Sequence, residues 1–269
     1  MSQLHIVVLA LVQGITEFLP VSSWSHLILV KELTGWPDHG LVVEMALHLG
    51  TLGAVVVYFW RDLWAMAAGL FQSRRGRREP SAHLFFAIVV GTLPVVLAGY
   101  LLHEFLGDPP RTLGVIGVTT LVFGLLLYLA DKRGMTVRRI EHLTIPDAFL
   151  IGCAQVIALI PGASRSGITM TAGRFLGFER RDAARFSFLL SIPASLGAGV
   201  LSGIDLYNAG DSLLTFGALE AIGLAFVAAL LSIHALLAWL NRRTFTPFVI
   251  YRVILGVALI ALAYGDFWT

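Results

Sequence analysis

Six long apolar stretches constrain the fold of this 269-residue sequence more than any other feature. A helix needs about 20 apolar residues to cross the roughly 30 Å hydrocarbon core of a bilayer. Each stretch is close to that length, so each is predicted to be a transmembrane helix. The stretches cover residues 41–60, 83–102, 113–130, 185–203, 213–240 and 247–264.

The low charge content indicates that lipid is the solvent of this chain. Charged residues make up 13% of the sequence and hydrophobic residues 57%, whereas a soluble domain carries about 25% charged residues. So few charges could not cover a water-facing surface of this size. No linker or shift in composition divides residues 1–269, which are therefore expected to form a single integral membrane domain.

Lys and Arg gather in alternate connections between the stretches. Cytoplasmic loops collect these residues, so three connections are predicted to face the cytoplasm and the first span to begin outside. The basic run at 74–78 could instead bind anionic lipid or nucleic acid, but orientation is the simpler interpretation, and a net charge of +2 gives no indication of nucleic acid. The three basic connections hold Arg61, Arg74, Arg75, Arg77 and Arg78; Lys132, Arg133, Arg138 and Arg139; and Arg242 and Arg243, while the other two hold only Arg111.

Two further apolar segments, residues 2–34 and 146–176, are each broken in the middle by proline. The breaks read QGITEFLPVSSWSH and AQVIALIPGASRSGIT. Proline removes a helix donor and clashes with the preceding turn, and free backbone groups at membrane depth are tolerated only where protein or a water-filled cavity satisfies them. Each segment is therefore predicted to be a re-entrant helical hairpin, two short helices around an unwound elbow.

The two hairpins look like copies of one unit inserted from opposite sides. In each, a Gln precedes a break of the type Pro-Val-Ser or Pro-Gly-Ala-Ser, and a short helix and a span follow. The fold predicted is an all-α polytopic membrane protein with six transmembrane helices and two re-entrant hairpins in an inverted repeat, with halves at roughly 1–130 and 131–269. Such repeats place a binding site near the midplane, where the elbows meet.

Each elbow carries one charge at predicted membrane depth, Glu17 in the first and Arg165 in the second. A charge at the centre of a span costs roughly 2.5–3.5 kcal/mol on insertion scales, so such residues tend to be paired and functional. A buried ion pair without a function is the alternative. It would leave the surrounding hydroxyls and glycines unexplained.

The second elbow has the composition of a phosphate-binding loop. Glycines let the backbone approach a ligand, free N–H groups at a helix start point toward an anion, and arginine matches phosphate oxygens. No Gly-Lys-Ser/Thr follows, so this is not a Walker loop. A helix break with an arginine reaching the interface is the simpler alternative. The residues predicted to bind phosphate are Ser22, Gly162, Ser164, Arg165, Ser166, Gly167 and Thr169.

In the first elbow, Ser22 and Ser23 lie four and three residues before His26, spacings that place hydroxyl and imidazole on one helical face. A serine becomes a nucleophile when a base lies within hydrogen-bond reach. Glu17 could orient His26, act as acid or base, or hold a divalent metal. Gln13, one turn earlier, could share a metal or a phosphate.

Glu44 and His48 are one helical turn apart at the start of the first span. They could line the mouth of the cavity. An interfacial location without a role is an equally good interpretation of this pair.

These motifs resemble the bacterial undecaprenyl-diphosphate phosphatase family, also called bacitracin-resistance proteins. The family pattern Glu/Gln-x-x-x-Glu-Phe-Leu-Pro-Val-Ser-Ser, followed by a His, matches Gln13 to Ser23 with His26, and the later Pro-Gly-x-Ser-Arg-Ser-Gly matches 161–167. The resemblance covers essentially the whole chain. It implies that Ser23 is the nucleophile, His26 its acid–base partner, Glu17 the essential carboxylate and Arg165 the phosphate-binding arginine.

The resemblance further implies hydrolysis of undecaprenyl diphosphate to undecaprenyl phosphate and inorganic phosphate, which recycles the cell-wall lipid carrier and confers bacitracin resistance. It implies Mg²⁺ or Ca²⁺ as cofactor, with Glu17 and Gln13 as the candidate ligands. It also implies a location in the bacterial plasma membrane, among membrane lipids, with the cleft open to the outer face. A homodimer is compatible with it.

Two departures from the family pattern bear on activity. Trp24 and Ser25 stand where the family usually has Thr-Gly, which removes a hydroxyl beside the proposed nucleophile and adds bulk. Gln13 leaves one carboxylate fewer for a metal. Direct attack by water, with Ser23 as a hydrogen-bond donor, stays open, and so does a transporter or lipid-phosphate flippase built on the same inverted repeat.

Overall fold

A computed structural model describes residues 2–37, 40–73, 79–107, 112–134, 136–209 and 216–264. Arg111 and the basic run at 74–78 lie outside these residues. The described chain is all-α, and six of its helices are long and apolar enough to cross a membrane, which confirms the predicted spans. These six are α3 (Gly40–Tyr58), α5 (Pro80–Leu101), α6 (Leu113–Arg133), α9 (Arg180–Ala209), α10 (Phe216–Leu240) and α11 (Thr246–Tyr264).

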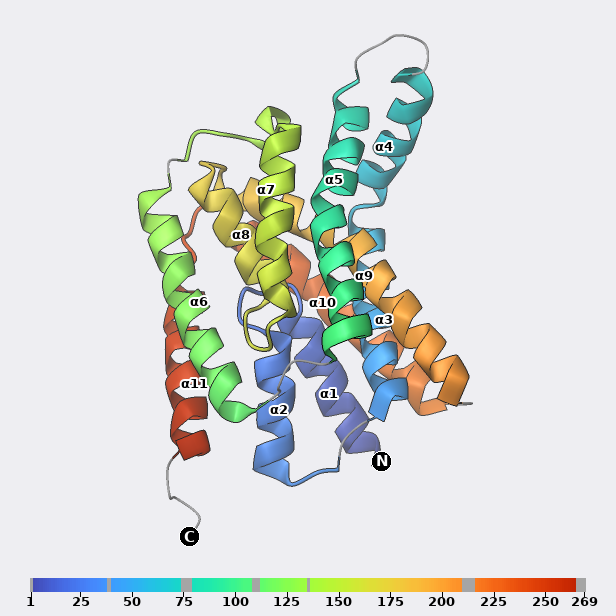
Figure 1. Ribbon diagram of the computed structural model, residues 1–269, viewed down its shortest axis with the longest axis vertical. Helices are drawn as coiled ribbons and strands as arrows, with labels where there is room; N and C mark the ends of the chain where they lie inside the picture. The colour runs from blue at the N-terminus through green and yellow to red at the C-terminus, as the bar shows by residue number, and fades with distance from the viewer. Residues whose placement is uncertain are drawn as a thin grey trace.

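The two proline-broken segments form helix–elbow–helix hairpins. One is α1 (Gln3–Thr16) and α2 (Ser23–Thr34); the other is α7 (Ile145–Val156), the short 3-10 turn η3 (Ile157–Leu159) and α8 (Arg165–Phe175). Figure 1 shows α1 and α2 in the lower half of the molecule and α7 and α8 in the upper half, with both elbows at mid-height. This arrangement is consistent with two re-entrant hairpins of opposite direction.

The connection after the first span contains a helix that the sequence did not lead us to expect. α4 (Trp60–Ser73) follows α3 and packs against α5. The helix is amphipathic. Met66 is buried against the protein, while Trp64 and Phe71 are 72% and 71% exposed. Because its apolar stripe is interrupted by Arg61 and Asp62, the segment looked like a polar loop in the sequence. The remaining short elements are η1 (Leu102–Leu106) and η2 (Ile140–His142).

The helices pack in pairs that follow the repeat. α1 packs against α10 and α7 packs against α5, while α6 and α11 pack against each other. Small residues make these contacts close, as is common between membrane helices. A Cβ added to Gly152 of α7 would lie 2.2 Å from the carbonyl oxygen of Gly91 in α5, and one added to Gly117 of α6 would lie 3.1 Å from the carbonyl oxygen of Gly256 in α11.

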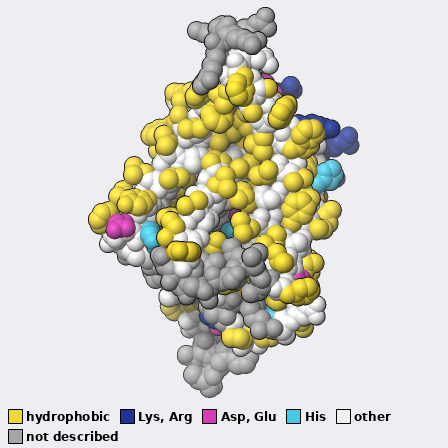
Figure 2. Space-filling view, turned by 90° about the vertical axis from the view of Figure 1, so that its right-hand side faces the viewer, with side chains coloured by type: hydrophobic (Ala, Val, Ile, Leu, Met, Phe, Trp, Pro, Cys, Tyr) yellow, Lys and Arg dark blue, Asp and Glu magenta, His cyan; other side chains and the backbone are white. Residues whose placement is uncertain are grey.

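The outer surface is apolar where lipid would surround it. Leu93, Val122, Leu231 and Ile254, each from a different span, are 59%, 50%, 66% and 64% exposed. Figure 2 shows hydrophobic side chains over most of one face, with most of the visible Lys and Arg in the upper part. Patches of this extent are rare on soluble monomers, so the surface agrees with a multi-pass membrane protein.

A buried ion network closes the end of the molecule that carries the basic connections. The Asp131 carboxylate, at the end of α6, pairs with the Nε atoms of Arg174 at 3.2 Å and Arg180 at 2.7 Å. It also accepts the backbone N–H of Phe245 from the α10–α11 connection at 3.2 Å. Asp131 and Arg174 are almost fully buried. One carboxylate therefore ties together the ends of α6 and α8, the start of α9 and the connection before α11.

The close contact between α5 and α7 predicts a stability effect. Gly152→Ala should lower the melting temperature of the purified protein by several degrees, because overpacking a tight contact costs about 1–3 kcal/mol. Gly223→Ala is the matched control, since a Cβ there meets nothing within 4 Å and alanine favours the helix. Differential scanning fluorimetry in detergent measures both variants. Equal melting temperatures for the two would contradict the described α5–α7 packing.

Candidate active site between the two elbows

The two elbows share an unusual backbone geometry. Ser22 and Ser164 both have positive φ angles, 74° and 70°, and they are the only described non-glycine residues that do. Each is the N-cap of the helix that follows, and its hydroxyl accepts the backbone N–H three residues on, from Ser25 at 3.4 Å and from Gly167 at 3.2 Å. Positive φ is strained for a residue with a side chain. Both elbows therefore make the same turn.

Aligning the elbows on these two serines reveals corresponding positions. Gln13 and Gln155 lie nine residues before them, and both are fully buried. Ser23 and Arg165 directly follow them, as the first residues of α2 and α8. This correspondence is stronger support for the inverted repeat than the loose pattern in the sequence.

Arg252 of α11 holds both elbows. Its side chain is fully buried, and its guanidinium donates to the backbone carbonyls of Pro20 (3.4 Å) in the first elbow and of Gly162 (3.2 Å) and Ala163 (3.1 Å) in the second. Its Nε donates to the carbonyl of Thr120 in α6 at 3.0 Å. The carbonyl groups freed by the helix breaks are thus satisfied by protein, as membrane depth requires.

Hydroxyl groups complete this support. Thr119 and Thr120 of α6 donate to the carbonyls of Pro161 (2.6 Å) and Gly162 (3.3 Å). Ser166 donates to the carbonyl of Leu19 at 3.0 Å, which links one elbow to the other directly. The elbows are therefore fixed to each other and to α6 and α11.

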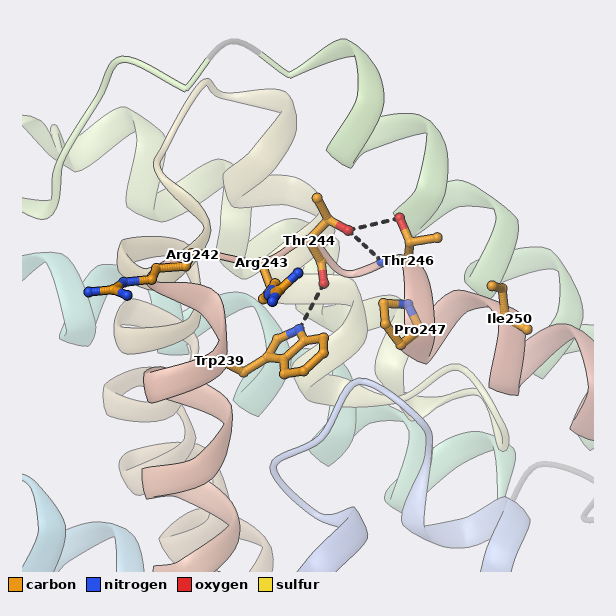
Figure 3. A pocket seen from close by; sticks show the side chains of 7 residues that line it. All are labelled: Trp239, Arg242, Arg243, Thr244, Thr246, Pro247 and Ile250. Atoms are coloured by element: carbon orange, nitrogen blue, oxygen red, sulfur yellow. Dashed lines mark hydrogen bonds between the residues drawn. The ribbon is translucent and has the colours of Figure 1, made fainter.

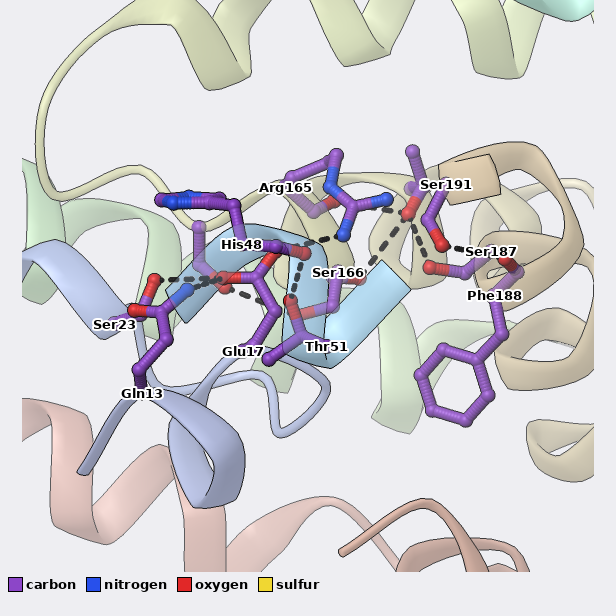
Figure 4. A network of polar contacts seen from close by, with 12 residues as sticks. Gln13, Glu17, Ser23, His48, Thr51, Arg165, Ser166, Ser187, Phe188 and Ser191 are labelled. Atoms are coloured by element: carbon purple, nitrogen blue, oxygen red, sulfur yellow. Dashed lines mark hydrogen bonds and ion pairs between the residues drawn. The ribbon is translucent and has the colours of Figure 1, made fainter. Parts of the chain in front are cut away.

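Glu17 is the centre of the polar network between the elbows (Figure 4). Its Oε1 pairs with Arg165 Nη2 at 2.8 Å. Its Oε2 accepts hydrogen bonds from the Ser23 hydroxyl and from Gln13 Nε2, both at 3.0 Å. The side chains of Glu17 and Arg165 are 11% and 19% exposed to solvent. The network is therefore largely buried but still in contact with solvent. Three of the predicted catalytic residues, Glu17, Ser23 and Arg165, are thus brought together, and Gln13, predicted as a metal ligand, contacts the same carboxylate.

His48 lies beside this network. Figure 4 places its imidazole beside Glu17 and Ser23, and the two groups interact electrostatically. Its Nδ1 lies 2.9 Å from the carbonyl oxygen of Glu44, one turn earlier in α3. A carbonyl oxygen can only accept, so Nδ1 carries a hydrogen there and Nε2 is directed elsewhere. Glu44 itself stays partly exposed in α3.

His26 does not form the predicted pair with Ser23. Its Nδ1 lies 2.7 Å from the Ser22 carbonyl oxygen, and its Nε2 lies 2.6 Å from the hydroxyl oxygen of Tyr251 in α11. The two rings are stacked with centroids 5.4 Å apart. Helical spacing allowed a shared face, but the bond to Ser22 turns the imidazole toward α11, while Ser23 turns toward Glu17. The expectation of a hydroxyl–imidazole pair is therefore wrong for this structure.

Most residues of the predicted phosphate-binding loop have partners inside the protein. Thr169 donates to backbone carbonyls of its own helix and lies 2.6 Å from the Ser187 hydroxyl of α9. A Cβ at Gly167 would lie 2.7 Å from Arg252, so this glycine makes room for the arginine. Ser22 is buried, while Ser164 is partly exposed. In this structure Arg165 is the member of the set that contacts Glu17.

Sequence reasoning missed Arg252, although a signal for it existed. It is a single arginine inside the apolar stretch at 247–264, and an intramembrane charge is by itself an indication of function. Thr119 and Thr120 gave no such signal, because threonines are common in membrane helices.

Comparison with known proteins places the whole chain in one group. The profile of the family described as "Bacitracin resistance protein BacA" matches residues 6–258. The chain is 53% identical to "Undecaprenyl-diphosphatase 1" of Rhodospirillum rubrum, over 97% of this chain and 95% of that protein. It is 48% identical to the "Undecaprenyl-diphosphatase" proteins of Ruegeria pomeroyi and Chromohalobacter salexigens, over 98% and 97% of this chain and 100% and 98% of those proteins. With this near full-length similarity, the chain belongs to the bacitracin resistance protein BacA family.

Proposed function

We propose that this chain is an integral membrane phosphatase that hydrolyses undecaprenyl diphosphate to undecaprenyl phosphate and inorganic phosphate. The reaction would recycle the cell-wall lipid carrier and confer bacitracin resistance. One observation carries the proposal: a serine hydroxyl, a carboxylate and a guanidinium meet between the elbows, at Ser23, Glu17 and Arg165. The names of the relatives agree with it.

Arg165 is the proposed ligand of the terminal phosphate. Its guanidinium is paired with Glu17 in the structure, and a diphosphate entering the site would compete with that carboxylate for the same donors. Arginine matches phosphate oxygens bidentately. Moving the guanidinium onto the phosphate would stabilise charge on the transferring group and leave Glu17 free as a base.

The contact between Ser23 and Glu17 supports a covalent mechanism. The Ser23 hydroxyl donates to Glu17 Oε2 at 3.0 Å, within the reach expected of a nucleophile and its base. In the first step the Ser23 Oγ–P bond forms, the bridging P–O bond breaks, and the serine proton passes to Glu17. Undecaprenyl phosphate leaves. In the second step water attacks phosphorus, the Oγ–P bond breaks, and Glu17 returns its proton to the Ser23 oxygen. Inorganic phosphate then leaves as dihydrogen phosphate, with both hydrogens of the water.

The contacts of His26 support a positioning role in place of the acid–base role implied by family resemblance. Its two ring nitrogens engage Ser22 and Tyr251, so the imidazole fastens the start of α2 to α11. Ser23, the next residue after Ser22, would be aimed at Glu17 through this contact.

A divalent cation is proposed to bind beside Glu17. Gln13 Oε1 is buried and has no hydrogen-bond partner, while its amide nitrogen donates to Glu17. An unsatisfied hard oxygen next to a carboxylate suits Mg²⁺ or Ca²⁺. The described residues contain no group of three or more His, Cys, Asp or Glu that could hold a metal, so substrate oxygens and water would supply the remaining ligands. A bound cation would neutralise charge on the diphosphate.

The proposed cleft opens toward the outer face of the membrane. The buried Asp131 network and the basic connections lie at one end, which the distribution of Lys and Arg assigns to the cytoplasm. The first hairpin enters from the opposite end (Figure 1). The lipid tail would then stay in the bilayer while the diphosphate reaches Glu17 from outside.

Removing any member of the central contact should stop phosphate release. Glu17→Gln, Ser23→Ala and Arg165→Ala are each expected to lower the rate by 100-fold or more, because each removes charge or the nucleophile from the transition state. The measurement is inorganic phosphate released from undecaprenyl diphosphate by purified protein, with melting temperature as a check of folding.

Glu32→Gln and Arg133→Ala are the matched controls, since both residues are exposed. They should leave turnover unchanged. Normal turnover in Ser23→Ala would exclude the covalent step, and a wild-type protein that moves the lipid without releasing phosphate would favour a transporter.

The cation hypothesis makes a separate prediction. Gln13→Glu should tighten Mg²⁺ binding several-fold, because a second carboxylate replaces the neutral amide oxygen, and Gln13→Ala should weaken it. Calorimetric titration of the substrate-free protein measures the affinity directly. Affinities that do not differ among the three proteins would show that the cation binds elsewhere.

A further inference from the structure

A second pocket lies between the ends of α10 and α11 (Figure 3), and none of the residues that line it belongs to the network around Glu17. It has a volume of about 620 Å³. Trp239 closes it on the α10 side, and Pro247 and Ile250 close it on the α11 side. Arg243 and Thr244, from the short connection, lie above them.

The pocket exists because α10 and α11 diverge. α10 packs mainly on α1 and α3, whereas α11 packs mainly on α6, and Trp239 of α10 meets Phe248 of α11 edge-on with ring centroids 6.5 Å apart. Their connection is short, so a wedge opens directly below it. Trp239 and Ile250 face this wedge and are 40% and 55% exposed. Where this wedge faces the hydrocarbon, a lipid acyl chain can fill it.

The upper part of the wedge is basic. Arg243 lies over the Trp239 ring with its guanidinium carbon 6.0 Å from the ring centroid, and Arg242 stands at the rim. Arg138, Arg139, Arg174, Arg180 and Arg185 at the same end are all ion-paired with carboxylates. Within the described part of the chain, neither Arg242 nor Arg243 makes an ion pair with a carboxylate.

The connection also supplies a hydroxyl donor. Trp239 Nε1 donates to the Thr244 carbonyl at 3.0 Å, which fixes the indole against the loop. The Thr244 hydroxyl donates to the Thr246 hydroxyl oxygen at 2.9 Å. That bond uses the Thr244 hydrogen, so the Thr246 hydroxyl hydrogen can point to an anion in the pocket.

The depth of this pocket in the membrane indicates what kind of molecule would bind in it. The α10–α11 connection is bound to Asp131 through the Phe245 N–H, so it lies at the end assigned to the cytoplasm, at the level of the lipid head groups. Basic pockets between membrane helices on this side bind anionic lipid head groups. Tryptophan favours the same interface.

We propose that this pocket binds an anionic phospholipid of the cytoplasmic leaflet, with its phosphate on Arg243, Arg242 and the Thr246 hydroxyl and an acyl chain along Ile250 in the wedge between α10 and α11. The proposal does not depend on phosphatase activity. It would hold equally for a transporter with this fold.

The test is native mass spectrometry of the full-length, delipidated protein in detergent, titrated with phosphatidylglycerol or phosphatidylethanolamine. The wild type should bind phosphatidylglycerol more tightly. Arg242→Gln/Arg243→Gln should lose about 10- to 30-fold in affinity, since each basic residue near an anionic lipid contributes about a factor of five. The matched control is Lys132→Gln/Arg133→Gln, which removes the same charge from exposed residues at the end of α6. It should bind like wild type.

Three outcomes would overturn the proposal. Equal affinity for the two lipids would show that the pocket does not select an anionic head group. An equal loss of affinity in both double variants would indicate general charge attraction instead of a specific site. Full competition by inorganic phosphate at concentrations near the lipid affinity would show a free-phosphate site without a lipid.

Discussion

The structure depends on how backbone carbonyl groups are satisfied where two helices are broken at membrane depth. Water cannot reach these groups, and each unsatisfied one would cost several kcal/mol. Arg252 donates to three elbow carbonyls from α11, and Thr119 and Ser166 donate to others. The elbows are consequently rigid and close together. Rigid elbows also hold Glu17, Ser23 and Arg165 in a fixed geometry, as a reaction between positioned groups requires.

The inverted repeat uses one backbone turn for two chemical purposes. Ser23 and Arg165 occupy the same position after the strained serines, yet one offers a hydroxyl and the other a permanent positive charge. Glu17 has no charged counterpart, because Leu159 stands at the matching position of the second hairpin. The Glu17 carboxylate can therefore contact Ser23 and Arg165 without repulsion from a second carboxylate. The two elbows thus share one backbone turn but carry different side chains, and together they form one site with a carboxylate, a hydroxyl and a guanidinium.

The sequence predicted the architecture well because apolar length and broken helices are strong signals. The six spans, the two elbows and the proximity of Glu17 to Arg165 all followed from hydropathy and from the cost of intramembrane charge. Side-chain direction could not be predicted in the same way. The i, i+3 spacing of Ser23 and His26 suggested a pair, but the contact of His26 with Tyr251, a residue more than 200 positions away, decides its orientation. α4 was missed because two charged residues interrupt its apolar face, and the position of His48 beside Glu17 depends on how α3 packs against α1.

The most direct test of the central claim is a double-mutant cycle on the Glu17–Arg165 contact, read as unfolding free energy and not as activity. Glu17→Gln, Arg165→Gln and the double variant would be compared with wild type by denaturant unfolding in mixed micelles. If the opposed elbows bring these side chains together, each single change leaves a shielded charge unpaired, and the double variant should be less destabilised than the sum of the singles by about 0.5–3 kcal/mol. Strictly additive losses would contradict the contact, and with it the convergence of the two elbows in one site.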